Sequence, residues 1–201
     1  MDSKNQAFLR GRVGAAPHVS HLNHGVIYYQ FPLEVERLSG AVDTLNILAP
    51  QGLLEACPVT VGEEYELTGE VRSYNNRSGV GSRLVITFLA RTIAPWWGEH
   101  ANQLELSGVL CKPPVVRRTP LGREICDLLL AVNRRYGRAD YLPCIAWGAL
   151  ARYCGELTVG DGVRLTGRLQ SRTYRKVEGE RQEERVAYEV SVAEAEKQER
   201  E

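Results

Sequence analysis

The chain has 201 residues, among them 25 Lys+Arg and 25 Asp+Glu, so its formal net charge at pH 7 is zero. This balance excludes a histone-like protein that is basic throughout, and no apolar run is long enough to span a bilayer. The length allows one large domain or two of about 100 residues, and a hydrophobic content of 43% suffices for a buried core. We therefore expect a globular, cytoplasmic protein.

The chain contains a long internal repeat, which divides it into two copies. Four matches occur in the same order: NQAFLRG at 5–11 with NQLELSG at 102–108, VER at 35–37 with VNR at 132–134, Asp43 with Asp140, and VGEEYELTG at 61–69 with VGDGVRLTG at 159–167. The offset is 97 residues and becomes 98 after the middle. A period near 100 is too long for a solenoid and indicates two tandem domains. The expected boundaries are a first domain at 1–94, a linker at 95–101, a second domain at 102–193 and a charged tail at 194–201.

Both copies are predicted to be all-β, with one short helix each. In the first copy we expect strands at 6–14, 26–37, 43–49, 65–73 and 82–92, and a helix at 52–57. In the second copy we expect strands at 103–112, 125–134, 141–147, 162–174 and 184–193, and a helix at 148–154. Five strands with a short helix between the third and fourth is the order of an OB-fold barrel, a five-stranded Greek-key barrel. The loops at 113–124, 135–140 and 174–183 should project from the second barrel.

The third strand of each copy alternates in polarity, which predicts its two faces. Its inward face should carry Leu45, Ile47 and Ala49 in the first copy and Leu142, Cys144 and Ala146 in the second. Its outward face in the second copy should carry Tyr141, Pro143, Ile145 and Trp147. Large outward rings are costly in water unless something covers them. Either a nucleic-acid base or another subunit could do so.

Basic and aromatic residues interleave between Lys112 and Lys176, a segment that contains 13 Lys+Arg and only 5 Asp+Glu. Basic side chains neutralise phosphates and flat rings stack on bases, so this stretch predicts nucleic-acid binding rather than a merely solvated basic face. The candidate phosphate contacts are Lys112, Arg117, Arg118, Arg123, Arg134, Arg135, Arg138, Arg172, Arg175 and Lys176. The candidate stacking rings are Tyr136, Tyr141, Trp147 and Tyr174.

Other motifs give no sign of catalysis or of a cofactor. His18, His21 and His24 have a spacing that could suggest zinc, but they lack neighbouring Cys or carboxylate ligands, so surface histidines are the expectation. GxSxG and phosphate-loop motifs are missing, as are the paired carboxylates that a nuclease needs for metal. We therefore expect no enzyme, no metal and no cofactor. The five cysteines form no CxxC pair and should be buried free thiols.

Two features flank the barrels. Trp96 and Trp97 in the linker should pack between the domains, with an exposed stacking platform as the alternative. The tail from residue 194 is charged and has no apolar stripe, so we expect a frayed end.

The second copy resembles a known family. PPVVRRTPLGREICDLLLAVNRRYGRADYLPCIAWG at 113–148, LTGRLQSRTYRK at 165–176 and VAYEVSV at 186–192 are similar to the single-stranded DNA-binding (SSB) proteins, in particular their bacterial tandem-OB form. The resemblance covers 102–193 and is weaker over the first copy. It implies sequence-independent binding of single-stranded DNA in replication, recombination or repair, near the nucleoid. It also implies base stacking by the four rings named above.

The first copy departs from this pattern. Tyr141 aligns with Thr44, Trp147 with Pro50 and Tyr136 with Ser39, so most of the stacking set is missing there. Weaker contacts are expected at Arg37, Arg72, Tyr74 and Arg77. We expect the first domain mainly to support assembly.

The resemblance also bears on partners. Single-OB relatives form tetramers, so a chain with two OB folds is expected to form a homodimer with four. The acidic end EAEKQERE lacks the apolar tip by which the family recruits replication proteins, so recruitment of such partners by that route is not expected. The alternative is a replication or primosome adaptor whose OB surfaces bind proteins, and RNA is not distinguished from DNA.

Overall fold

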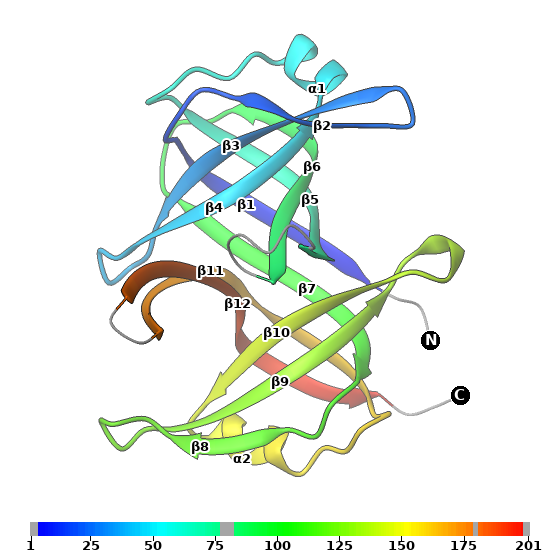
Figure 1. Cartoon of the computed structure of the whole chain (residues 1–201), viewed down its shortest axis with the longest axis vertical. Coiled ribbons are helices and arrows are strands. Elements are labelled where there is room, and N and C mark those ends of the chain that lie inside the picture. The colour runs from blue at the N-terminus through cyan, green and yellow to red at the C-terminus, as the bar shows by residue number, and fades with distance from the viewer. Residues whose placement is uncertain (1–3, 77–82, 179–180, 199–201) are drawn as a thin grey trace. The chain divides into compact units, whose positions relative to one another are not determined.

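The computed structural model describes residues 4–76, 83–178 and 181–198, and Figure 1 shows an all-β chain with two short α-helices in this part. Side chains are described for these residues except Arg135, Lys176, Val177, Glu178, Arg181 and Glu183. Residue contacts group the chain into two compact units. The N-terminal unit comprises Gln6–Arg72 and Ile86–Gln103, and the C-terminal unit comprises Met1–Asn5, Ser73–Val85 and Leu104–Glu201.

The first barrel is closed and lies mainly in the N-terminal unit, although Asn5, Ser73–Asn75 and Leu84–Val85 of its strands group with the C-terminal unit. Its elements are β1 (Asn5–Val13), β2 (His18–Asn23), β3 (Val26–Glu36), β4 (Val42–Pro50), α1 (Gln51–Ala56), β5 (Glu64–Asn75) and β6 (Leu84–Pro95). The strands follow the order β3-β4-β6-β5-β1, and β1 pairs with β3 as well as with β5, which closes the barrel. β4 and β6 are parallel, whereas β1 and β4 each pair with β3 in antiparallel fashion. The core contains the fully buried Leu9, Phe31, Leu45, Leu67 and Phe88.

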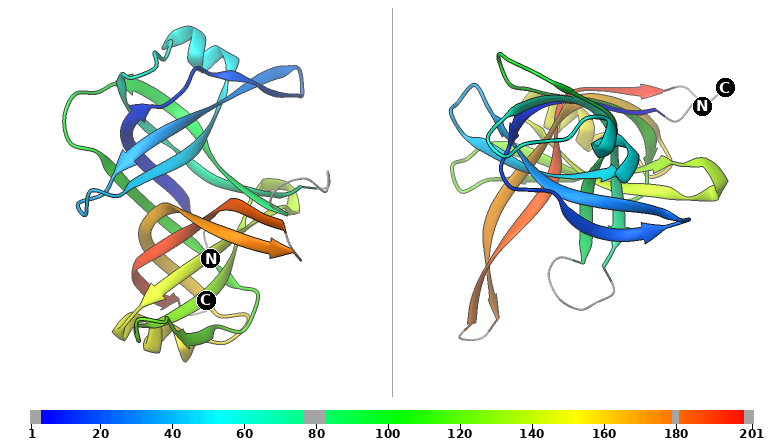
Figure 2. Two further views of the ribbon diagram at one scale, coloured as in Figure 1. Left: turned by 60° about the vertical axis from the view of Figure 1, so that its left-hand side comes forward. Right: turned by 90° about the horizontal axis from the view of Figure 1, so that it is seen from above.

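The C-terminal unit repeats this arrangement. Its elements are β7 (Ala101–Leu110), β8 (Val115–Arg118), β9 (Glu124–Asn133), the 3-10 turn η1 (Arg135–Gly137), β10 (Ala139–Trp147), α2 (Ala149–Gly155), β11 (Gly162–Glu178) and β12 (Arg181–Gln198). β7 pairs with both β9 and β11, and β10 is parallel to β12. β11 and β12 run together as a long hairpin, drawn in orange and red in Figure 2. The fold is therefore the expected tandem pair of OB barrels.

Matched glycines explain part of the sequence repeat. A Cβ on Gly11 would overlap the carbonyl oxygen of Glu34, and one on Gly108 would overlap that of Ala131. The same holds for Gly69 against the Leu89 carbonyl oxygen. Only glycine lets two backbones approach so closely at these crossings.

Two loops expected from the sequence are strands. β2 pairs with β3, and β8 pairs with β9, so the segments expected as loops before the second strand of each copy extend the sheets. Their side chains are all exposed, which leaves no alternation to predict them by. The expected loop at 174–183 is likewise strand up to Glu178 and again from Arg181.

Residues 194–198 of the expected frayed tail are also strand, since β12 continues to Gln198 and pairs with β11 at Gly162, whereas 199–201 lie outside the described residues. Lys197 donates its backbone N–H to the Tyr153 hydroxyl at 3.0 Å, and its Nζ lies 2.9 Å from Asp161 Oδ1. Charged side chains do not prevent this pairing, because the ladder is made by backbone groups.

The contacts differ from the expected domain boundaries at several places: Met1–Asn5 and Ser73–Val85, expected in the first domain, group with the C-terminal unit. The expected linker at 95–101 and residues 102–103 group with the N-terminal unit. In the linker, Trp96 is half-buried with its ring 3.5 Å from the guanidinium of Arg10, whereas Trp97 is 79% exposed.

The cysteines are free thiols, as expected. Cys126, Cys144 and Cys154 are buried, and Cys57 and Cys111 are half-buried. Burial raises the pKa of Cys154 to about 11, with a smaller contribution from Cys126. None of the helices in the described part of the chain combines the length and apolar character that crossing a membrane requires.

Candidate nucleic-acid interface

The outward face of β10 exposes two aromatic rings. Tyr141 is 47% exposed and Trp147 is 39% exposed, while the expected inward residues are buried: Leu142, Cys144 and Ala146. Ile145 shares the outward face with these rings by strand alternation, yet its side chain is buried. In the sheet it lies between Asp127 on β9 and Ser191 on β12. The exposed rings are therefore confined to the two ends of the strand.

Tyr136 lies at the turn between β9 and β10 and is 97% exposed. Its backbone has φ 64° and ψ 37°, in the left-handed region that a bulky residue rarely adopts. The turn is closed by a 2.7 Å hydrogen bond from the N–H of Arg134 to the carbonyl of Arg138. An unfavourable backbone here presents the whole ring to solvent, and such outliers concentrate at functional sites.

Tyr174 lies on β11, in the long hairpin. Its ring is half-buried, and the guanidinium carbon of Arg172 lies 5.7 Å from the ring centroid. Arg172 is exposed, and its Nε is 3.8 Å from Glu189 Oε1 on β12. Arg175, one residue further, is exposed too. The hairpin therefore carries one ring with two cations beside it.

Several predicted phosphate contacts are exposed and make no ion pair with another described side chain: Lys112, Arg123, Arg138 and Arg175. Arg168, which the sequence prediction omitted, has the same character. The strand alternation around Leu165 and Leu169 could have revealed it. Of the remaining candidates, Arg77 lies outside the described residues, and Arg135 and Lys176 have undescribed side chains.

Two predicted contacts on β8 are exposed but ion-paired. Arg117 is bidentate to Asp127, with Nη2–Oδ1 at 3.1 Å, and Arg118 Nη2 lies 3.3 Å from Glu124 Oε1. Arg152 also pairs with Glu124, at 2.7 Å. Such exposed pairs are weak, so these arginines could exchange a carboxylate for a phosphate.

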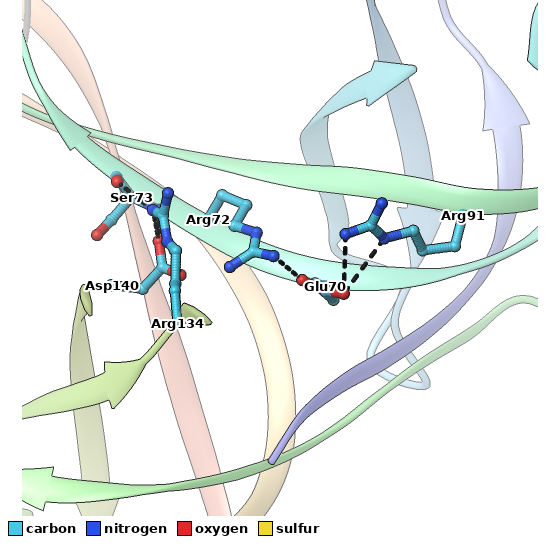
Figure 3. Close-up of polar contacts among 6 residues, drawn as sticks. All are labelled: Glu70, Arg72, Ser73, Arg91, Arg134 and Asp140. Atoms are coloured by element: carbon cyan, nitrogen blue, oxygen red, sulfur yellow. Dashed lines mark hydrogen bonds and ion pairs between the residues drawn. The ribbon is translucent and has the colours of Figure 1, made fainter. Parts of the chain in front are cut away.

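Arg134 is not placed for the predicted phosphate contact. Its Nε donates to Asp140 Oδ2 at 2.6 Å, and its Nη2 donates to the Ser73 carbonyl at 2.9 Å and to Asp140 Oδ1 (Figure 3). Asp140 is fully buried, so the guanidinium balances a carboxylate that water cannot reach. The sequence could not separate this arginine from its exposed neighbours.

The two described arginines among the weaker candidates of the first copy are also ion-paired. Arg37 is bidentate to the buried Asp43, with Nε–Oδ2 at 2.7 Å, and Arg72 is paired with Glu70, which also accepts from Arg91 at 3.1 Å (Figure 3). Tyr74 is 54% exposed.

The histidines of the β2–β3 hairpin are exposed, and His21 stacks on Tyr28 with ring centroids 5.0 Å apart. Across the described side chains, no group of three His, Cys, Asp or Glu could hold a metal ion.

Two closed five-stranded barrels, each with a short helix after its third strand, define a tandem OB-fold protein. The profile of the Single-strand binding protein family matches residues 101–197. Single-stranded DNA-binding protein B of Bacillus subtilis (strain 168) is 36% identical over 88 residues, which are 39% of this chain and 75% of that protein. The chain belongs to the single-strand binding protein family.

Further similarities cover different parts of the chain. The Single-stranded DNA-binding protein of Thermus aquaticus is 41% identical over 85 residues, which are 40% of this chain and 32% of that protein. The match thus spans about a third of the length of that relative. The crystal structure of wild-type single-stranded DNA binding protein from Thermus aquaticus superposes with a TM-score of 0.82 at 24% identity, covering 100% of this chain and 96% of that chain. The similarity in fold therefore includes both units.

Proposed function

We propose that the protein binds single-stranded DNA without regard to base sequence, mainly through its C-terminal unit, in replication, recombination or repair. The observation that carries the proposal is the outward face of β10, where Tyr141 and Trp147 remain substantially exposed in a strand whose other residues are buried or half-buried. Exposed rings stack on any base, and the exposed cations of the same unit offer contacts to phosphates. The names of the relatives support the same ligand.

The proposed role is binding, not catalysis. Stacking and phosphate contacts require no acid, base or metal, and the rings and cations described above supply both kinds of contact. A protein with this role would lie with the nucleoid and could meet replication proteins there.

The N-terminal unit has a supporting role in this proposal, because Thr44, Pro50 and Ser39 replace the rings of the second copy. A homodimer would bring four OB folds together. Light scattering should then give twice the chain mass of 22.5 kDa, and a monomer would contradict the dimer.

A fluorescence titration tests the ligand. Oligo-dT should quench tryptophan emission strongly, duplex of equal length should not, and the affinity for oligo-dT should fall as salt rises. The chain has three tryptophans, so Trp147→Ala and the matched Trp97→Ala identify the reporter. Equal binding to duplex, or binding to neither, would contradict single-strand binding and would favour a protein-binding adaptor.

A further inference from the structure

Ser73, at the end of β5, is held on all three of its polar groups by the turn and strand that carry the candidate rings. Its N–H donates to Asp140 Oδ1 at 2.5 Å, and its carbonyl accepts from Arg134 Nη2 at 2.9 Å (Figure 3). Its Oγ accepts from the backbone N–H of Tyr141 at 2.7 Å. Ser73 is buried. Because these three hydrogen bonds hold Ser73, they also fix the position of the chain that follows it.

The next residue is Tyr74, whose side chain is 54% exposed. Successive strand residues point to opposite faces, so the burial of Ser73 directs Tyr74 toward solvent. Its Cα lies about 3.8 Å from that of Ser73, whose hydroxyl contacts Tyr141. Two exposed tyrosines, from segments far apart in sequence, are therefore joined by one hydrogen-bonded residue.

A cation lies in the same segment. Arg83 is exposed, and its carbonyl accepts from the N–H of Asn76 at 2.8 Å, so the chain just after Tyr74 is paired with the residue before β6. Ser73–Val85 belongs by its contacts to the C-terminal unit.

We propose that Tyr74 is a base-stacking residue of the C-terminal binding surface, contiguous with Tyr141, and that Ser73 and Asp140 are its positioning residues. This inference rests on the proposed function. As a member of the first copy Tyr74 would be isolated, because the positions equivalent to the other rings carry Thr44, Pro50 and Ser39. Beside Tyr141 it extends a platform on which neighbouring bases of one strand can stack.

The stacking role is tested by titrating oligo-dT into four proteins: wild type, Tyr74→Ala, Tyr74→Phe and Val159→Ala. Tyr74→Ala should weaken binding by about 5- to 150-fold, which corresponds to one stacked base. Tyr74→Phe keeps the ring and should stay within about twofold of wild type. Val159, exposed on a turn of the same unit, is the matched control for removal of an exposed apolar side chain, and its variant should bind as wild type.

The outcomes separate the inference from the proposed function. If Trp147→Ala weakens binding while Tyr74→Ala does not, the inference is wrong and single-strand binding stands. If wild type fails to bind oligo-dT, both are wrong. An affinity reduced equally in Tyr74→Phe and Tyr74→Ala would also overturn stacking.

The positioning role is tested with Ser73→Ala, alone and combined with Tyr74→Ala. The variant keeps both rings and every cation, so the salt dependence of binding should be unchanged while the affinity falls. In the Tyr74→Ala background, Ser73→Ala should have a smaller effect, because the ring it positions is gone. An equal effect in both backgrounds would overturn the positioning role. Thermal unfolding of each variant establishes that the proteins compared are folded.

Discussion

Arg134 holds the buried carboxylate of Asp140 across the turn between β9 and β10, with Nε–Oδ2 at 2.6 Å. The N-terminal unit repeats the pair at the equivalent turn, where Arg37 Nε lies 2.7 Å from Asp43 Oδ2. The repeated arginine thus maintains a turn in both barrels, including the one that lacks most of the aromatic set. Its retention in the sequence repeat has a structural cause.

Arg134→Ala should therefore act on stability. Removing one partner of a buried ion pair leaves an uncompensated charge and costs about 3–5 kcal/mol. Urea denaturation should show this decrease in unfolding free energy, whereas Arg123→Ala, which removes an exposed arginine nearby in sequence, should unfold as wild type. Equal unfolding midpoints for the two variants would contradict a structural Arg134.

The exposed cations should govern the salt dependence of DNA binding. When a substitution removes one phosphate interaction from a single-strand complex, the slope of log affinity against log salt becomes shallower by about 0.7. We expect this change for Arg138→Ala, measured with oligo-dT between two salt concentrations. Arg91→Ala serves as the comparison, since that exposed arginine of the N-terminal unit pairs with Glu70 and is not a candidate contact, and its slope should not change.

Tyr136 should show opposite effects on stability and on binding. Tyr136→Gly relieves the cost of a left-handed backbone, about 1 kcal/mol, so its melting temperature should rise. The same substitution removes a fully exposed ring and should weaken oligo-dT binding by about 1–3 kcal/mol. Tyr136→Ala should weaken binding without the gain in stability. A lower melting temperature for the glycine variant would show that the ring has a structural contact.

The pKa of Cys154 predicts a decrease of stability in alkali. Its pKa is raised to about 11 in the folded protein, above the ordinary value of 9.0, so the folded state resists ionisation of the thiol. The contribution of the buried thiol to the free energy of unfolding is complete below about pH 9 and declines as the pH rises toward 11. Cys154→Ala should show a smaller difference in unfolding free energy between pH 8 and pH 10 than wild type. Cys57→Ala is the control, and an identical decline in both variants would contradict this assignment.

The sequence could predict those features that repeat or alternate. Two copies of a periodic pattern were sufficient for the tandem barrels, and the alternation of the third strand placed Tyr141 and Trp147 outward. Alternation did not reveal that Ile145, on the same face, is buried, because the pattern of one strand does not show what covers that face. The sequence prediction failed for Arg134 because a paired and a free arginine look alike until Asp140 and Ser73 are placed beside it. β2 and β8 were missed because strands with two exposed faces carry no periodic signal.

The close backbone approach at Gly11 and at Gly108 limits how far the sequences of the two halves can differ. Where a side chain would strike a carbonyl oxygen of the crossing strand, no substitution is open to either half, however different their tasks become. The surface rings meet no such restriction, and the two halves differ at most of these positions. Two copies of one OB barrel can therefore carry different side chains on their surfaces, whereas glycine is required at the strand crossings of both.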